Sequence, residues 1–337
     1  MKAVAYKTPG SIDREDALQD ITLQKPTADG RDLLVKINAV SVNPVDTKLR
    51  NGVAPENEEW RVLGFDAAGV VEGVGAQVQH FETGAAVFYA GSVIRPGTNS
   101  EYHLVDERIV GHKPASLSDA EAAALPLTSI TAWEMLFDRL DVNRPTRQGE
   151  NLILIIGGAG GVGSITLQLL RALTDLTVIA TASRPETKDW VRDCGAHHVI
   201  DHRQPLAPQV EALGLGAPGF VFSTTQTDQH FADIVELIAP QGRFGLIDDP
   251  KELNALPLKL KAVSLHWEMM FARSRFGTPD MAEQGKLLNE VAKLVDAGRI
   301  RTTATEIAGK IDAATLRAVH ARIESGSALG KIVLEGF

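Results

Sequence analysis

The chain has 337 residues, of which 44% are hydrophobic and 23% are charged. This length is enough for two domains of ordinary size, and the composition is that of a globular protein. The 34 basic and 43 acidic residues leave a formal charge of −9, and no long basic run occurs, which disfavours nucleic acid as the main partner. No apolar stretch approaches the length of a membrane span and the N-terminus does not resemble a secretory signal, so we expect a cytoplasmic protein without a membrane partner.

The segment up to about residue 125 is rich in turns and carries short runs with a β pattern. These runs cover residues 33–42, 69–74, 85–89 and 102–105, and glycine is frequent between them. They predict an all-β, partly barrel-like domain. A helical pattern follows from Ser118 to Phe137, where Ser118 serves as an N-cap and Glu121 completes a capping box.

A short apolar run, residues 152–156, is predicted as a strand buried on both faces of a parallel sheet. It stops in a glycine-rich turn, in which Gly158, Gly160 and Gly163 have the G-x-G-x-x-G spacing of a dinucleotide fingerprint. The first glycine permits a tight turn, the second allows backbone N–H groups to approach a pyrophosphate, and the third lets the following helix pack closely on its strand.

The context of this turn favours a ligand at the helix N-terminus. A helix with one buried face follows, and run 177–182 supplies the next strand of a βαβ unit. The residues at helical spacing are Val162, Ile165, Thr166, Leu169, Leu170 and Leu173. The alternative is a strand, turn and helix that bind no ligand.

The residues after the second strand bear on the choice of cofactor. An NAD site usually places an acidic residue about twenty positions after the glycines, where it accepts hydrogen bonds from the ribose hydroxyls. Here Ser183, Arg184 and Lys188 occupy this region, and a serine with two cations would hold a 2′-phosphate. We therefore expect NADPH. In the alternative, Arg184 and Lys188 are solvated and Glu186 binds the ribose.

Alternating strands and helices continue to about residue 263. Strands are predicted at 196–200, 220–223 and 244–247, with a helix at 228–238, which is the order of a doubly wound α/β domain. The tail does not continue this repeat, so we expect it to fold back onto the first domain. Its predicted elements are a helix at 280–297, a strand at 302–307, a helix at 313–323 and an apolar run at 330–334. The predicted domains are residues 1–125 with 272–337, and residues 126–271 inserted between them.

Several motifs, in order along essentially the whole chain, resemble the medium-chain dehydrogenase/reductase superfamily, in particular its zinc-free quinone oxidoreductase-like branch. The chain is also similar to bacterial proteins called zinc-type alcohol dehydrogenase-like. The resemblance implies a Rossmann domain inserted in a GroES-like catalytic domain, and a homodimer with contacts at about residues 243–265. The motifs are AVSVNPVDTKLRNG (39–52), LGFDAAGVVEGVG (63–75), PLTSITAWEML (126–136), GGAGGVGSITLQLL (157–170), LIAPQGRFGLI (237–247) and GKIVL (330–334).

The chain departs from the zinc-dependent members of this superfamily at the metal ligands. Those members place a cysteine in the segment that matches Val42–Asp46 and Gly-His-Glu where this chain reads Gly64, Phe65 and Asp66. The four-cysteine lobe of the structural zinc is also missing, because Cys194 is the single cysteine, and we expect it to be a small core residue. We therefore predict that no zinc binds.

Without a metal, the charge that hydride transfer builds on oxygen must be stabilised by hydrogen-bond donors. By resemblance, Asn43 and Thr128 lie at positions that flank the nicotinamide, and Asn43 could polarise the substrate oxygen. Asn43 and Asp46 also suit the cap of a helix that begins near Pro44, and we expect Asp46 to be structural. Tyr89 is a candidate proton donor or aromatic wall, with a half-buried strand tyrosine as the alternative.

The expected activity is NADPH-dependent reduction of a quinone or an α,β-unsaturated carbonyl (enone) without a metal. The alternatives are a zinc-type alcohol dehydrogenase and a non-catalytic NADPH-binding sensor or structural homologue. His202 is expected near the adenosine, with a solvated loop histidine as the alternative. The expected cofactor-binding residues are Gly157, Gly158, Gly160, Gly161, Val162, Gly163, Ser183, Arg184, Lys188, His202, Ser223 and Thr224.

Overall fold

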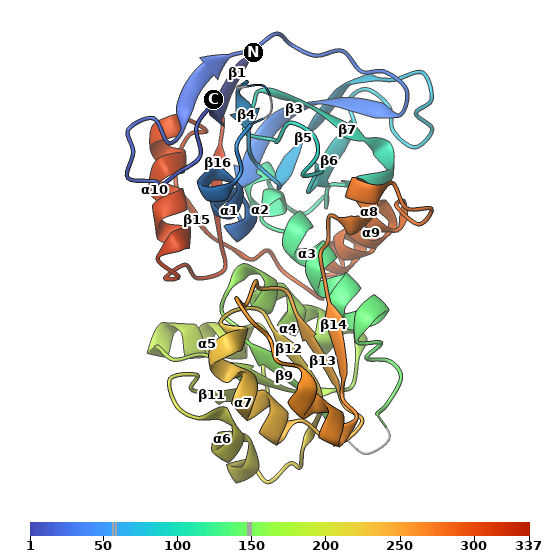
Figure 1. The fold of residues 1–337 in the computed structure, drawn as a ribbon. Helices are drawn as coiled ribbons and strands as arrows, with labels where there is room; N and C mark the ends of the chain where they lie inside the picture. The colour runs from blue at the N-terminus through green and yellow to red at the C-terminus, as the bar shows by residue number, and fades with distance from the viewer. Residues whose placement is uncertain (56, 58, 147–149) are drawn as a thin grey trace. The chain divides into compact units, whose positions relative to one another are not determined.

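The computed structural model describes residues 1–55, 57, 59–146 and 150–337. The chain divides into two compact units. The first unit comprises Met1–Ile130 and Phe271–Phe337, and the second comprises Thr131–Met270. Both ends of the chain therefore belong to the first unit (Figure 1). No helix in the described residues is long and apolar enough to cross a bilayer.

The first unit is built mainly from antiparallel strands. A three-stranded sheet has the order β2 (Gln19–Thr22), β1 (Lys2–Tyr6) and β4 (Arg61–Val62). In a seven-stranded sheet, β3 (Asp32–Ser41) pairs with β5 (Ala67–Val74), with β7 (Tyr102–Asp106) and with β16 (Lys331–Glu335). The remaining strands are β6 (Ala86–Tyr89), β8 (Val110–His112) and β15 (Ala304–Ile307). Strand β16 of the tail pairs with β3, so the tail lies in the first unit.

Helices complete the first unit, and one predicted helix is broken. The single helix expected over 118–137 consists of α2 (Asp119–Ala123), α3 (Pro126–Trp133) and a π-helical turn, η3 (Glu134–Arg139), which belongs to the second unit. Pro126 explains the first break, because proline has no N–H to continue a helix and suits the start of a new one. Ser118 and Glu121 form the expected capping box. The other helices are α1 (Pro44–Gly52), η2 (Glu107–Ile109), α8 (Ala272–Phe276), α9 (Glu283–Asp296) and α10 (Ala313–Glu324).

The second unit contains a six-stranded parallel sheet in the order β11-β10-β9-β12-β13-β14. Its strands are β9 (Glu150–Ile156), β10 (Thr177–Thr181), β11 (His198–Ile200), β12 (Pro218–Ser223), β13 (Arg243–Leu246) and β14 (Ser264–Trp267). The chain starts at the central strand β9, moves to one edge, and returns through β12 to the other edge. This is the strand order of a doubly wound dinucleotide-binding sheet, whose ligand site lies where the order reverses. The predicted fold class is confirmed.

The helices of the second unit cover both faces of this sheet. Leu154 and Ile156 pack with α6 (Leu206–Ala212) and α7 (Thr227–Leu237) in one core cluster. Because alternate residues of a strand face opposite sides, Ile153 and Ile155 face the side of α4 (Gly161–Leu173) and α5 (Pro185–Asp193). Helix α4 is buried over most of its circumference, including Ser164, Thr166 and Gln168, and not on the single face that its spacing predicts. A short 3-10 segment, η4 (Leu256–Lys261), precedes β14.

Candidate functional site

The glycine turn after β9 is fixed by three glycines with different roles. Gly157, and not Gly158, has the left-handed backbone that the tight turn needs, with φ of +84°. A Cβ on Gly158 would lie 3.0 Å from the Cβ of Ala180 and 3.2 Å from Val191, so this glycine allows close packing against β10 and α5. A Cβ on Gly163 would lie 2.3 Å from the carbonyl oxygen of Gly157. The start of α4 therefore packs directly on the turn.

Gly160 is the one fingerprint glycine that the folded chain does not itself require. Its backbone is extended, with φ of −74° and ψ of 175°, which any residue can adopt. A Cβ at this position would meet only the carbonyl oxygen of Gly157, at 3.7 Å. Gly160 is also the N-cap of α4 and supplies no side chain to its first-turn N–H groups. The open space and these N–H groups form a cradle that suits an anionic group.

The carboxyl ends of β9 and β12 meet next to this turn. The N–H and the hydroxyl of Thr224 both donate to the carbonyl of Ile156, at 3.1 and 2.9 Å. Ser223 is buried, and its hydroxyl lies 2.8 Å from that of Thr227, within hydrogen-bonding distance. Thr227 is held in turn by Asp248, whose carboxylate accepts its N–H at 2.8 Å. Thr224 thus lies at the switch point of the sheet. The Ser223 hydroxyl is instead hydrogen-bonded to Thr227 and helps to fix the end of β12.

The expected phosphate-binding residues follow β10 and carry paired charges. Arg184 forms an ion pair with Glu186 at 2.9 Å, and Lys188 lies 3.5 Å from Asp201. Side chains of both cations are partly exposed. Glu186 therefore lies beside a cation of its own segment.

A further cation, Arg203, follows β11 and was not predicted from the sequence. Its Nη2 donates to the carbonyl of Ser183 at 3.0 Å, and its guanidinium pairs with Asp201 at 2.7 Å. This pairing lowers the pKa of the Asp201 carboxyl. Because β10 and β11 are parallel neighbours, their carboxyl ends bring Arg203 next to Ser183. The signal in the sequence is a basic residue directly after the neighbouring strand.

His202 precedes Arg203 and is half-buried. Its ring lies 6.4 Å from that of His230 at an interplanar angle of 62°. Burial, together with the neighbouring His230, lowers the pKa of His202. The side chain is therefore partly buried, and its ring is neutral near pH 7.

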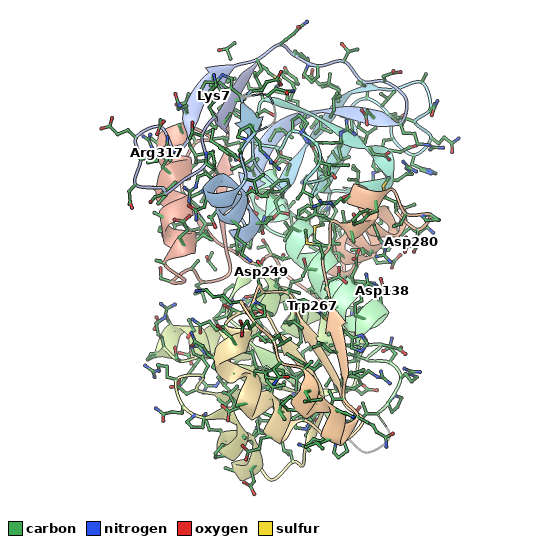
Figure 2. All side chains as sticks on the ribbon, in the orientation of Figure 1. Lys7, Asp138, Asp249, Trp267, Asp280 and Arg317 are labelled. Carbon is green, nitrogen blue, oxygen red and sulfur yellow. The ribbon has the colours of Figure 1, made fainter. Side chains whose placement is uncertain are left out.

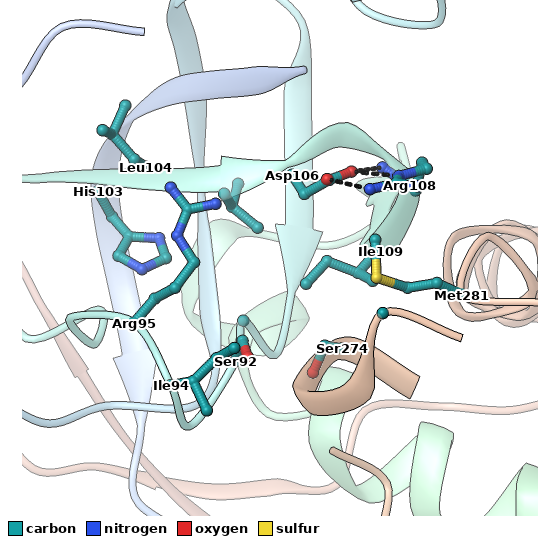
Figure 3. A pocket seen from close by; sticks show the side chains of 13 residues that line it. Ser92, Ile94, Arg95, His103, Leu104, Asp106, Arg108, Ile109, Ser274 and Met281 are labelled. Atoms are coloured by element: carbon teal, nitrogen blue, oxygen red, sulfur yellow. Dashed lines mark hydrogen bonds and ion pairs between the residues drawn. The ribbon is translucent and has the colours of Figure 1, made fainter. Parts of the chain in front are cut away.

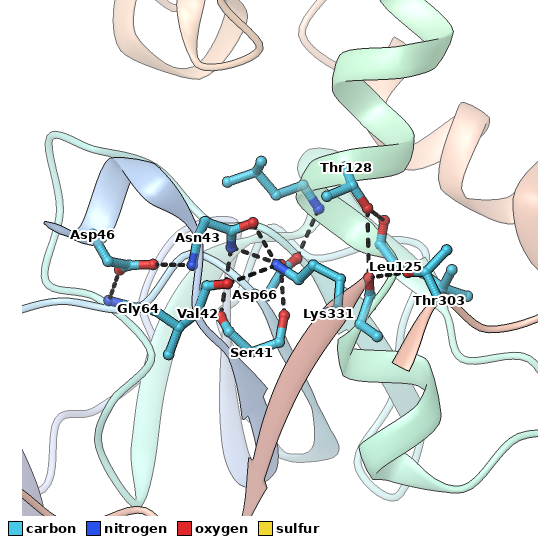
Figure 4. Close-up of polar contacts among 12 residues, drawn as sticks. Ser41, Val42, Asn43, Asp46, Gly64, Asp66, Leu125, Thr128, Thr303 and Lys331 are labelled. Atoms are coloured by element: carbon cyan, nitrogen blue, oxygen red, sulfur yellow. Dashed lines mark hydrogen bonds and ion pairs between the residues drawn. The ribbon is translucent and has the colours of Figure 1, made fainter. Parts of the chain in front are cut away.

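In the first unit, Asn43 belongs to a buried polar network (Figure 4). Its Nδ2 donates to the Oδ2 of Asp66 at 2.7 Å, and its Oδ1 accepts from the Nζ of Lys331 at 2.5 Å. The second hydrogen of Nδ2 has only a 3.5 Å contact with the carbonyl of Ser41. One amide N–H of Asn43 is therefore weakly bonded within the protein.

Asp46 and Thr128 have structural contacts in the same region. Asp46 is buried, and its carboxylate accepts the backbone N–H groups of Asn43 and Gly64 at 2.8 and 2.9 Å. Helix α1 begins at Pro44, so the predicted cap is confirmed. Burial raises the pKa of Asp46 to about 7. The Thr128 hydroxyl is also buried and donates to the carbonyl of Leu125 at 3.1 Å.

Tyr89 is fully buried. The alternative of a half-buried strand tyrosine is therefore wrong in its degree of burial. The Tyr89 hydroxyl lies 3.1 Å from the Nδ1 of His103, whose Nε2 lies 2.8 Å from the carbonyl oxygen of Pro96. A carbonyl can only accept, so Nε2 carries the hydrogen, Nδ1 is the acceptor, and the Tyr89 hydroxyl donates to it. Burial raises the pKa of Tyr89 and lowers that of His103 to about 4. The proton of Tyr89 is therefore engaged within the core.

A cavity of about 160 Å³ lies beside His103 in the first unit (Figure 3). Its wall includes Arg95 and Arg108 but none of the predicted catalytic residues. Arg95 makes a two-pronged ion pair with Asp32, and Arg108 does the same with Asp106. Both arginine charges are thus compensated, and the cavity is separate from the network around Asn43.

The residues present do not fit a zinc ion. Zinc sites use thiolate, imidazole and carboxylate ligands with free electron pairs. Both carboxylate oxygens of Asp66 already accept hydrogen bonds, from Leu127, Ser41, Asn43 and Lys331. Across residues 1–55, 57, 59–146 and 150–337, no group of three or more His, Cys, Asp or Glu side chains could hold a metal ion. Cys194 is buried, as expected of a core residue.

Comparison with protein families gives two matches. Residues 29–115 match the alcohol dehydrogenase GroES-like domain, and residues 194–334 match the family described as zinc-binding dehydrogenase. The first match lies in the first unit, and the second begins in the second unit and continues into the tail.

Individual relatives resemble the chain over its whole length. A zinc-type alcohol dehydrogenase-like protein of Staphylococcus aureus (strain MSSA476) is 39% identical, and the match covers 99% of each chain. The crystal structure of a putative zinc-dependent alcohol dehydrogenase protein from Rhizobium etli CFN 42 is 62% identical, with a TM-score of 0.99, and the match covers 100% of this chain and 98% of that one. The quinone oxidoreductase of Escherichia coli complexed with NADPH shares the fold, with a TM-score of 0.82 over 100% of both chains at 22% identity.

Proposed function

Because the chain belongs to the medium-chain dehydrogenase/reductase superfamily of oxidoreductases, we propose that it reduces quinones or enones with NADPH and without a metal. The observation that carries the proposal is the cradle at Gly160. This glycine is required neither by its backbone conformation nor by packing, and it lies at the helix end and sheet switch point where dinucleotides bind. In this proposal the pyrophosphate meets the backbone of Gly157, Gly158, Gly160, Gly161, Val162 and Gly163.

The cations around Ser183 support NADPH over NADH. Arg184 and Arg203 follow the ends of two neighbouring strands, Lys188 lies in the first turns of α5, and Arg203 contacts Ser183 directly. Glu186 and Asp201 are already paired with these cations, so no uncompensated carboxylate opposes a 2′-phosphate. A phosphate would be held by charge-assisted hydrogen bonds from the guanidinium groups. Thr224 and His202 lie at the ends of β12 and β11 and complete the proposed site.

When bound, the cofactor supplies the hydride that reduces the acceptor. The reduction places negative charge on the acceptor oxygen, and a donor must stabilise this charge. In our proposal this donor is the N–H of Asn43 that contacts Ser41 only at 3.5 Å. Thr128, whose hydroxyl donates to the carbonyl of Leu125, then serves as a fixed wall. The Tyr89 proton is donated to His103, so the proton that completes the reduction comes from another source, such as water.

The names of the relatives favour one second candidate, a zinc-dependent alcohol dehydrogenase. The saturated hydrogen bonds of Asp66 argue against it. The test is metal analysis of the purified protein, followed by assay after treatment with a chelator. We expect no stoichiometric zinc and unchanged activity. One zinc per chain together with loss of activity on chelation would favour the alcohol dehydrogenase.

The main test is a steady-state comparison of NADPH and NADH with a panel of acceptors. The panel contains 1,4-quinones, enones, aldehydes and, in the reverse direction, alcohols. We expect turnover of quinones or enones and a preference for NADPH. Tight NADPH binding without turnover of any acceptor would favour the non-catalytic sensor, and a preference for NADH would overturn the argument from Arg184 and Arg203.

We also propose that two copies associate through the edge strand β14. This strand ends the sheet of the second unit, and the Trp267 side chain is exposed there (Figure 2). Leu256 and Leu260 of η4 are exposed as well. The range 243–265 that the sequence suggests needs a correction, because Arg243 lies in the interior strand β13 and its guanidinium donates to the carbonyls of Leu140 and Asp141. The contact we propose comprises η4 and β14.

A further inference from the structure

The Asp66 carboxylate contacts three other segments of the first unit, around Ser41 and Asn43, at Leu127 and at Lys331 (Figure 4). Its Oδ1 accepts the backbone N–H of Leu127 at 2.7 Å. Its Oδ2 accepts the Ser41 hydroxyl at 2.9 Å, the Asn43 amide at 2.7 Å and the Lys331 ammonium at 2.9 Å. Leu127 is in the first turn of α3, where a negative charge is favourable. One carboxylate therefore contacts the side chain of Asn43 and the residue that precedes Thr128.

Lys331 is the cationic partner of this carboxylate and is itself buried, with 4% of its side chain exposed. Its Nζ donates to the Oδ2 of Asp66, to the Oδ1 of Asn43 and to the carbonyl of Val42 at 3.1 Å. These three acceptors use all three hydrogens of an ammonium group. A buried ion pair is tolerated when its remaining hydrogen-bonding groups are satisfied in this way.

The two charges determine which way the Asn43 amide points. An ammonium can only donate, so it fixes the amide oxygen, and a carboxylate can only accept, so it fixes the amide nitrogen. A reversed amide would place Oδ1 against the carboxylate and Nδ2 against the ammonium, and both contacts would be repulsive. Lys331 and Asp66 therefore select a single orientation, in which the weakly bonded N–H of Asn43 is always in the same place.

We propose that Asp66 and Lys331 are positioning residues that hold the Asn43 amide and the first turn of α3, with Thr128, in one fixed arrangement for the reduction. The proposal rests on the proposed function for its effect on turnover. It assigns a role to the terminal segment of the chain, because β16 brings Lys331 to the start of α1. Neither residue contacts the reacting groups in this proposal.

The first test compares Lys331→Met with Lys36→Met. Lys36 is exposed on β3 and serves as the matched control. We expect Lys331→Met to lower kcat by about tenfold or more, because misplaced catalytic groups cost up to about a hundredfold. We expect the dissociation constant of the cofactor to stay within about twofold, because its proposed site lies in the second unit. A folded Lys331→Met protein with the kcat of the wild type would overturn the proposal.

The second test separates positioning from stability and uses the double variant Asp66→Asn/Lys331→Met, which removes both charges together. We expect it to recover melting temperature relative to Lys331→Met, because no uncompensated charge stays buried, but not to recover kcat. If kcat and melting temperature recover together, the network is merely structural. If Lys331→Met does not fold, the kcat of the double variant is compared with that of the wild type instead.

A third readout does not depend on turnover. In NMR spectra of the uncomplexed protein, the side-chain NH₂ of Asn43, assigned by its loss in Asn43→Asp, is expected as two sharp resonances. These resonances should shift and broaden in Asp66→Asn/Lys331→Met, where the orientation is no longer selected. Unchanged resonances would contradict the positioning role. A wild-type protein that reduces no acceptor would instead overturn the proposed function and leave this readout valid.

Discussion

The glycines of the turn after β9 differ, residue by residue, in how much space surrounds them. A Cβ on Gly163 would lie 2.3 Å from a backbone oxygen, whereas a Cβ on Gly160 would meet nothing closer than 3.7 Å. An alanine substitution at each position can therefore distinguish a glycine that the fold requires from a glycine that ligand binding requires. The fold requires Gly163, and in our proposal only the cofactor requires Gly160.

We predict that Gly160→Ala keeps the melting temperature of the wild type but weakens cofactor binding by about tenfold or more, since the methyl group would obstruct the approach of the pyrophosphate. Gly163→Ala, the matched variant, should destabilise the second unit by at least about 1–3 kcal/mol through overpacking. Thermal unfolding and calorimetric titration with NADPH measure the two effects. Equal affinities of Gly160→Ala and wild type would contradict the proposed pyrophosphate site.

Arg184 and Arg203 allow a second prediction about single residues. We expect Arg184→Gln and Arg203→Gln each to reduce the ratio of kcat/KM for NADPH to that for NADH by about tenfold, the effect of losing one charge-assisted hydrogen bond. The control is Arg192→Gln, an exposed arginine of α5 that is paired with Asp189. A control that changes the ratio as much as the other two variants do would contradict a 2′-phosphate site at Arg184 and Arg203.

At the scale of elements, the π-helical turn η3 and the strand β14 bring two buried carboxyl groups together. Glu134 begins η3, Glu268 directly follows β14, and Arg139 contacts Glu268 at 2.8 Å. Both glutamates are fully buried or nearly so. Burial, and then the neighbouring Glu134, raise the pKa of Glu268 to about 8 in spite of Arg139. The protonated form of Glu268 is therefore the stable one near neutral pH.

This arrangement predicts that stability falls as pH rises. In the folded protein Glu268 keeps its proton up to about pH 8, whereas in the unfolded chain its pKa has the ordinary glutamate value of 4.5. Between these values the folded state binds more protons, so the free energy of unfolding decreases by up to about 1.4 kcal/mol per pH unit. Glu268→Gln stays neutral and should remove this slope, raising the melting temperature relative to wild type increasingly from pH 5 to about pH 8.

The matched control for this pH series is Glu252→Gln, since Glu252 is an exposed glutamate of the same unit. Its melting temperature should follow that of the wild type across the whole pH range. A constant difference between Glu268→Gln and wild type from about pH 5 to pH 8 would show that Glu268 is ionised in both the folded and the unfolded states.

The sequence predicted five of the six strands of the second unit's sheet, because buried parallel strands and a glycine turn have strong local signals, but it predicted neither β14 nor α6. The strand after the turn was expected at 177–182 and is Thr177–Thr181, and the helix expected at 228–238 is Thr227–Leu237. The π-helical turn Glu134–Arg139 could not be predicted. Its extra residue per turn leaves no mark in the hydrophobic spacing and is fixed by tertiary contacts.

At the scale of the whole molecule, sequence spacing identifies a site only where topology is regular. The residues after β9, β10 and β12 could be predicted because the ends of parallel strands meet at one edge. Asp66 and Lys331 are separated by 265 positions, and their contact depends on how β16 returns to β3. The motifs that contain Asp66 and Lys331 can be recognised in the sequence. No feature of the neighbouring residues, however, indicates that this aspartate and this lysine form a buried ion pair.

The proposed dimer gives the last prediction. Ser264 and Glu268 direct their N–H groups to Gly242 and Leu246, so alternation along the strand directs those of Leu265 and Trp267 away from β13. An edge strand with free N–H groups and exposed apolar side chains is a template for pairing. Trp267 is 52% exposed and Leu260 is 92% exposed, and pairing with a second copy would cover both.

We expect light scattering at micromolar concentration to give the mass of a dimer for the wild type and of a monomer for Trp267→Glu, because pairing would bury the added charge without a partner. Phe276→Glu is the control, since Phe276 is 74% exposed in the first unit and should leave the mass unchanged. A monomeric wild type, or a control that dissociates while Trp267→Glu does not, would contradict association through β14. Cofactor affinity should survive in the monomer, because Gly157, Thr224 and Arg203 all come from the second unit of one chain.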